Sequence, residues 1–169
     1  MRRYPEPDVP YFITTVTKDR TPLFQNPRLC RILLVTIEYY KTLFDYVVYG
    51  YCLMPDHLHL LLIPQGSFTI SFIMKMIKGS FAGKVNKLQG TSGPLWQPRF
   101  YDEMVRSEQQ LLNQLEYMHQ NPVKAELVSS AGEHLFSSFH QYHGLPNPEG
   151  RILEVERFGF EQQTKVDHV

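Results

Sequence analysis

Two histidines that flank a single leucine are the first residues of the sequence that could do chemistry. His57, Leu58 and His59 lie in an apolar run typical of a β-strand. Because side chains two apart in a strand point to the same face, His57 and His59 share one face and Leu58 points to the other. Two neighbouring imidazoles can chelate a divalent cation, with an oxygen ligand completing the shell. In a chain with seven histidines such a pair also arises by chance.

A tyrosine and an asparagine one helical turn apart form the second candidate feature. On the helix expected from Ser107, three leucines and Met118 fall within an arc of about 120°. Tyr117 lies outside that arc, so it is either a surface tyrosine or a residue with a chemical role. Asn121 shares its face if the helix continues that far. Asn121-Pro122 also fits the N-cap of a separate short helix, and both interpretations stay open at this point.

The middle of the chain is locally basic although the whole chain has no net charge. No acidic residue occurs between His57 and Tyr101. The candidate phosphate contacts of this stretch are Lys75, Lys78, Lys84 and Arg99. The alternative is an ordinary solvated helix face. The aromatic residues beside Arg99, which are Trp96, Phe100 and Tyr101, could stack on unpaired bases or fill the core, and we expect at least one in the core.

The length and composition of the chain, and the motifs that it lacks, narrow the possible classes of protein. A chain of 169 residues suits one domain, which we place at residues 1–144, with residues 145–169 as a tail that is partly ordered at most. Two cysteines in apolar runs indicate reduced thiols and a cytoplasmic protein, and neither a signal peptide nor a run long enough to span a membrane is present. The sequence has no phosphate-binding glycine loop, zinc-type cysteine pair or Gly-x-Ser-x-Gly motif, which argues against nucleotide hydrolysis, structural zinc and serine hydrolysis.

The elements that must position these residues follow a recognisable order. Six elements are expected first: a strand at Tyr11–Thr17, a helix beginning at Asn26-Pro27, strands at Tyr46–Leu53 and His57–Ile63, a helix at Thr69–Leu88 and a strand at Leu95–Val105. Pro98 makes the last of them an edge strand or delays its start. The helix from Ser107 should end near Gln120, before Pro122. The order predicts an α+β, ferredoxin-like antiparallel sheet with helices on one face, plus an added helix carrying Tyr117.

Three segments together resemble a known family. Tyr51–Leu62, Leu95–Tyr101 and Glu116–Val128 resemble the IS200-like transposases, and are most similar to their REP-associated tyrosine transposases, over roughly residues 10–143. The resemblance implies the ferredoxin-like fold and a divalent cation, Mg²⁺ or Mn²⁺. It implies that His57, His59 and Asn121 are the metal ligands and Tyr117 the nucleophile. Lys124 and Glu126 stand where many relatives have Arg and Gly, which makes Lys124 a candidate DNA contact.

The function implied by this resemblance is cleavage and rejoining of single-stranded DNA through a 5′-phosphotyrosine intermediate, at hairpin-associated sites. The expected setting is the nucleoid of a prokaryotic cytoplasm, and relatives include monomers and homodimers. Two alternatives have different chemistry: a domesticated protein that binds DNA or RNA hairpins without cutting, and a metal-dependent phosphodiesterase that uses water. The sequence does not name the base that activates the phenol, whose usual pKa is near 10.

Overall fold

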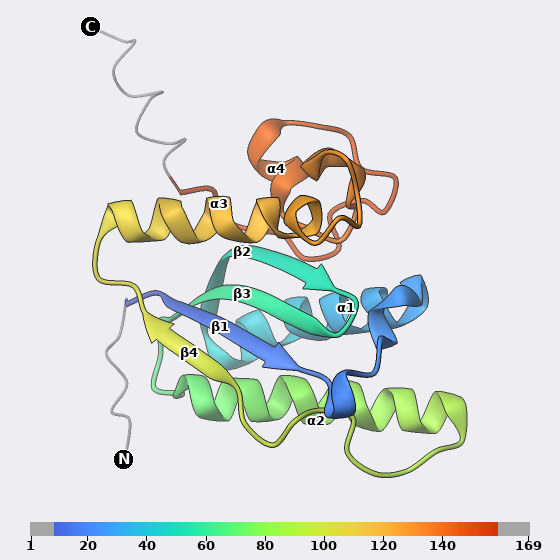
Figure 1. Ribbon diagram of the computed structural model, residues 1–169. Helices are drawn as coiled ribbons and strands as arrows, with labels where there is room; N and C mark the ends of the chain where they lie inside the picture. The colour runs from blue at the N-terminus through green and yellow to red at the C-terminus, as the bar shows by residue number, and fades with distance from the viewer. Residues whose placement is uncertain (1–8, 159–169) are drawn as a thin grey trace, which may run out of the picture.

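Four strands and four α-helices make up the computed structural model, which describes residues 9–158 (Figure 1). The strands are β1 Tyr11–Val16, β2 Tyr46–Met54, β3 His57–Pro64 and β4 Tyr101–Met104. The helices are α1 Pro27–Phe44, α2 Ile70–Gln89, α3 Glu108–Lys124 and α4 Phe139–His143. The sheet order is β2-β3-β1-β4 and every neighbouring pair is antiparallel. This confirms the ferredoxin-like arrangement.

The sheet separates two helical layers. Helices α1 and α2 cover one face, and α3 crosses the other (Figure 1). In β3 the leucines at positions 58, 60 and 62 are fully buried, and they point away from His59, whose ring faces α3. Alternation along one strand therefore supplies the core under α1 and α2 and leaves two histidines under α3. No helix within residues 9–158 has both the length and the hydropathy needed to cross a membrane.

Helix α3 is longer than the sequence suggested. The Ser107 side chain caps its start by accepting from Gln110 N, as expected, but the helix continues through Pro122 to Lys124 instead of ending near Gln120. Pro122 is buried, so its packing against the domain offsets the lost backbone hydrogen bond. The helix then ends over Glu126, which adopts a left-handed φ of 59° at the position where many relatives have glycine. The continuation excludes the interpretation of Asn121 as the N-cap of a separate helix.

The fourth strand begins late and lies at the sheet edge, in agreement with the effect expected of Pro98. Only Tyr101–Met104 pair with β1, whereas Trp96 forms an isolated bridge to Thr17. Trp96 is buried against Phe24 and Phe81, which confirms that one of the three neighbouring aromatic residues belongs to the core. Tyr101 is exposed on the edge strand.

The chain beyond α4 returns to β2 and α1. Leu153 is fully buried, and Glu156 N donates to Val48 O over 2.9 Å. Arg31 on α1 forms an ion pair with Glu149 at 2.7 Å. The described part of the expected tail, residues 145–158, therefore packs against the domain. Positions 159–169 lie outside the described residues.

Gly50 in β2 allows α3 to approach the sheet closely. A Cβ atom at this position would lie 2.7 Å from Leu115 Cδ2 and 2.9 Å from Met118 Cε, both on buried side chains of α3. We expect Gly50→Ala to lower the free energy of unfolding by about 1–3 kcal/mol, because the packed side chains must move. Urea denaturation measures this.

The control for this prediction is Gly83→Ala in α2. A Cβ there meets nothing within 4 Å, so alanine should raise the unfolding free energy by about 0.5–1 kcal/mol through helix propensity alone. If Gly50→Ala were as stable as the unchanged protein, close packing of α3 against β2 would not be required.

Candidate metal and nucleophile site

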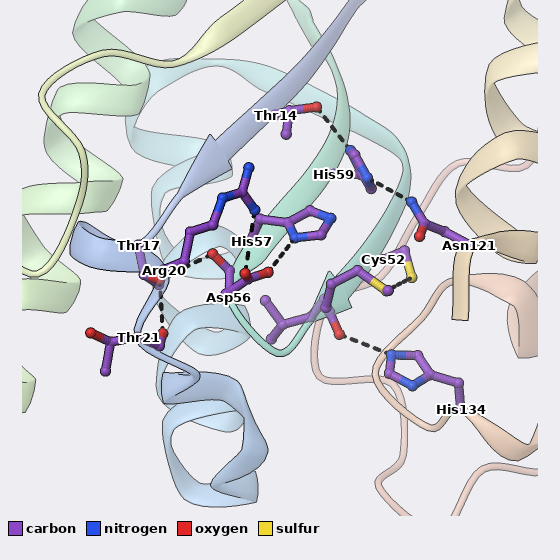
Figure 2. Close-up of polar contacts among 12 residues, drawn as sticks. Thr14, Thr17, Arg20, Thr21, Cys52, Asp56, His57, His59, Asn121 and His134 are labelled. Carbon is purple, nitrogen blue, oxygen red and sulfur yellow. Dashed lines mark hydrogen bonds and ion pairs between the residues drawn. The ribbon is translucent and has the colours of Figure 1, made fainter. Parts of the chain in front are cut away.

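Two secondary-structure elements bring the four residues of interest together. His57 and His59 lie on β3, and Tyr117 and Asn121 lie one turn apart on α3. The ring centroids of His57 and His59 are 4.8 Å apart, and those of His59 and Tyr117 are 5.5 Å apart. Asn121 Nδ2 is 2.9 Å from His59 Nε2 (Figure 2). Residues separated by about 60 positions in sequence thus form one cluster on the sheet face below α3.

His59 is held in one tautomer by two neighbours. An amide nitrogen can only donate, so His59 Nε2 accepts from Asn121 and the proton resides on Nδ1. Nδ1 then donates to Thr14 Oγ1 on β1 over 2.9 Å. The side chain is only 4% exposed. Burial, with a smaller effect of His57, lowers the pKa of His59 to about 3, so the ring stays neutral near pH 7 with its Nε2 lone pair directed at α3.

His57 is oriented by the residue that precedes it. Its Nδ1 lies 2.6 Å from Asp56 Oδ1, and Arg20 Nη1 lies 3.3 Å from the other carboxylate oxygen, Asp56 Oδ2 (Figure 2). Burial raises the pKa of Asp56, but the hydrogen bonds and charges of His57 and Arg20 outweigh it, so the net pKa lies below the usual range. The carboxylate therefore accepts from Nδ1, which leaves Nε2 of His57 available.

The donor atoms fit a divalent cation. Both histidines use Nδ1 for a hydrogen bond within the protein, which is the usual arrangement when Nε2 binds a metal. Among residues 9–158, no three His, Cys, Asp or Glu side chains lie together as a metal site, so the candidate third ligand within this range is of another type. Asn121 is such a residue, since its amide oxygen is a hard donor on the same side chain that already reaches His59.

Tyr117 lies at the border of this cluster with its ring half in solvent. The side chain is 45% exposed, and its ring packs edge-on against Phe12 at 6.1 Å and against His59. Lys124 Nζ lies 5.8 Å from the ring centroid. The aromatic neighbours hold the ring beside the histidines, and its exposure leaves it accessible to a macromolecular substrate.

The other basic candidates lie apart from this cluster. Lys75 and Lys78 project from α2 towards the segment 94–100, which also contains the exposed Arg99. Lys84 Nζ instead donates to Thr36 Oγ1 of α1 over 3.1 Å, a contact between the two helices. Of the five basic residues selected from the sequence, only Lys124 adjoins Tyr117.

Three residues that position the histidines were not found from the sequence. Thr14 could be recognised only from the register of β1 against β3, in which it is the partner of His59. Arg20 is brought to Asp56 by the 3₁₀ turn Lys18–Arg20 after β1. Asp56 had a local signal, because it directly precedes His57 in a tight connection, but its side chain could equally have faced solvent.

Several known proteins are similar to this chain. Residues 7–121 match the family described as Transposase IS200 like, a range that includes both histidines, Tyr117 and Asn121. A REP-associated tyrosine transposase of Haemophilus influenzae is 28% identical over 144 residues, which are 78% of this chain and 80% of the relative. One from Escherichia coli K12 is 27% identical over 93 residues, 54% of this chain and 53% of that protein.

Two solved structures share the fold. A REP-associated tyrosine transposase bound to a REP hairpin superposes with a TM-score of 0.70 at 24% identity, covering 94% of each chain. A transposase structure from Deinococcus radiodurans gives a TM-score of 0.51 at 20% identity, covering 71% of this chain and 97% of the other.

Proposed function

Because the chain belongs to the IS200-like transposase family, we propose that it cleaves and rejoins single-stranded DNA, with Tyr117 as nucleophile and a divalent cation held by His57, His59 and Asn121. The observation that carries the proposal is the position of Tyr117, whose ring centroid is 5.5 Å from that of His59 while nearly half of the side chain is exposed. A phenol in this position can reach a phosphate that is bound beside the histidines.

The proposed reaction conserves the energy of the phosphodiester bond. The Tyr117 phenol gives up its proton and its oxygen forms a bond to phosphorus, while the bond from phosphorus to the 3′ oxygen breaks. The 3′ oxygen takes up a proton and leaves as a hydroxyl, so no net proton is gained or lost. The product is a 5′-phosphotyrosine, and a second 3′-hydroxyl attacks it in the reverse sense to rejoin the strand. A bound Mg²⁺ or Mn²⁺ would polarise the phosphate and neutralise developing negative charge.

The residues around Tyr117 have separate roles in this proposal. Thr14 and Asp56 hold the Nδ1 atoms of the two imidazoles, so that a cation would bind Nε2 of His57 directly and Nε2 of His59 in place of its present contact with Asn121 Nδ2. Phe12 holds the Tyr117 ring from the side. Lys124 Nζ, 5.8 Å from the ring centroid, brings a positive charge near the negatively charged phosphate that Tyr117 would attack.

The substrate that we propose is a DNA strand with a hairpin next to the cleavage site. A protein of the same fold has been solved in complex with a REP hairpin. We also propose that one chain contains a complete site, because Tyr117 and Asn121 contact His59 of their own chain. Light scattering of the active protein would distinguish a monomer from a homodimer.

One assay separates this function from its alternatives. The protein is incubated with a labelled hairpin oligonucleotide and Mn²⁺, and the products are separated on a denaturing gel. We expect a protein–DNA adduct and a released 3′-hydroxyl fragment. Cleavage without an adduct would instead support a phosphodiesterase that uses water, and binding without cleavage would support a domesticated binding protein.

Thr14 should control the affinity for the cation. We expect Thr14→Val to weaken Mn²⁺ binding by about 10–100-fold, because residues that orient metal-bound histidines have effects of this size. Calorimetric titration of Mn²⁺ measures this.

The adjacent residue offers a matched control. The Thr15 hydroxyl is buried on the other face of β1 and has no hydrogen-bond partner among residues 9–158, so Thr15→Val should leave Mn²⁺ affinity unchanged. Equal Mn²⁺ affinity of the two variants would argue against the role of Thr14.

A further inference from the structure

A pocket away from the histidine cluster lies beside α2. It is a pocket with a volume of about 470 Å³ between α2 and the segment 94–100 that leads into β4. Its walls are largely apolar and include the side chains of Ala82, Trp96 and Phe100. Its charged lining residues are Lys75 and Lys78, and no acidic residue lines it.

The two lysines make this pocket suitable for an aromatic ring whose neighbouring groups are negatively charged. Lys75 is exposed, and Lys78 is partly buried and donates to Gln97 O over 3.0 Å. Lys78 Nζ also lies 5.9 Å from the centroid of the Phe100 ring. Arg99 is exposed next to Phe100 in the chain. An aromatic wall within a cluster of cations is the combination that binds unpaired nucleobases together with their phosphates.

The pocket is close enough to the histidines for one DNA strand to occupy both. Gln97 N donates to Val16 O over 2.9 Å, and Trp96 is the bridge partner of Thr17. On its other side Val16 pairs with His57. The backbones of Gln97 and His57 therefore flank the end of β1, and strand spacing places them roughly 10 Å apart.

We propose that this pocket receives one unpaired nucleobase of the DNA strand that the Tyr117 site cleaves, and that Lys75 and Lys78 contact the adjoining phosphates. The proposal rests on the proposed function for the identity of the strand. It assigns base recognition to α2 and the segment 94–100, on the opposite side of β1 from the chemistry at α3.

Gly79 provides a direct way to fill the pocket. It lines the pocket, and a Cβ placed on it meets nothing within 4 Å. Gly83 lies one turn later on α2, is equally open and does not line the pocket. Gly79→Phe and Gly83→Phe therefore make the same chemical change on one helix, and thermal unfolding should show that both are folded.

The test is binding of a hairpin oligonucleotide with single-stranded flanks, measured by fluorescence anisotropy without divalent cation so that no cleavage occurs. We expect Gly79→Phe to weaken binding about tenfold, in line with the loss of one stacked base, and Gly83→Phe to bind like the unchanged protein. An abasic nucleotide at one flank position should weaken binding by the unchanged protein to a similar degree and should have little further effect on Gly79→Phe.

Two results would overturn the proposal. One is equal affinity of the Gly79→Phe and Gly83→Phe variants. The other is an abasic effect that is as large in Gly79→Phe as in the unchanged protein. The adduct assay with Mn²⁺ at saturating DNA tests the proposed function separately. If Tyr117 were not the nucleophile, its DNA adduct would be missing, whereas the differences in DNA binding between the variants would remain.

Discussion

Replacement of Tyr117 by phenylalanine is expected to abolish covalent attachment to DNA and to lower cleavage by at least about 10³-fold, because only the attacking oxygen is removed. The hydroxyl makes no hydrogen bond within residues 9–158 that could couple it to stability, and the ring contacts with Phe12 and His59 remain in the variant. The unfolding free energy should therefore change by less than about 0.5 kcal/mol. Hairpin affinity should be unchanged.

Tyr39→Phe is the matched control for this prediction. Tyr39 is 69% exposed on α1, which covers the opposite face of the sheet, so its hydroxyl should be dispensable for cleavage. A Tyr117→Phe protein that still forms an adduct would show that another residue is the nucleophile.

His57→Ala is expected to have the second largest effect, a loss of cleavage of roughly 10²–10⁴-fold, because the cation supplies several kcal/mol of charge stabilisation in such reactions. His57 is the better residue for this test than His59, which is buried and bonded to both Thr14 and Asn121. Removal of His57 should leave hairpin binding within about twofold of the unchanged protein, measured in the absence of cation. Chelation of the cation should reproduce the loss in the unchanged protein.

The control for the histidine is His143→Ala. His143 is exposed at the end of α4, where its ring stacks on Phe139 at 4.1 Å. Its loss should leave cleavage intact. Substantial Mn²⁺-dependent cleavage by His57→Ala would contradict the assignment of His57 as a metal ligand.

The fold could be predicted from the sequence because its signals are local. Alternation placed His57 and His59 on the face opposite the core leucines, and the caps at Asn26 and Ser107 marked the starts of α1 and α3. The predicted end of α3 was wrong. The residue before a proline disfavours helix through local contacts alone, whereas Pro122 is buried against the rest of the domain and the helix continues through it. Trp96 in the core was anticipated as one of three aromatic candidates, which the sequence could not tell apart.

The positions of the residues that support the site depend instead on the register between strands and on the path of the loops. Thr14 meets His59 only because β1 and β3 pair in one register, and Arg20 reaches Asp56 only through the turn after β1. Neither relation leaves a periodic pattern in the sequence. Asn121 was ambiguous for a related reason, since its role depended on whether α3 continued past Gln120.

The most direct test of the nucleophile is to locate the adduct by mass spectrometry. Trypsin should release residues 107–124 as one peptide, bounded by Arg106 and Lys124, and Tyr117 is its only tyrosine. After incubation with hairpin DNA and Mn²⁺, followed by nuclease digestion, we expect this peptide to carry a 5′-linked nucleotide phosphate on Tyr117. Cleaved DNA together with an unmodified peptide, or with the modification on the Tyr101 peptide, would contradict the proposed mechanism.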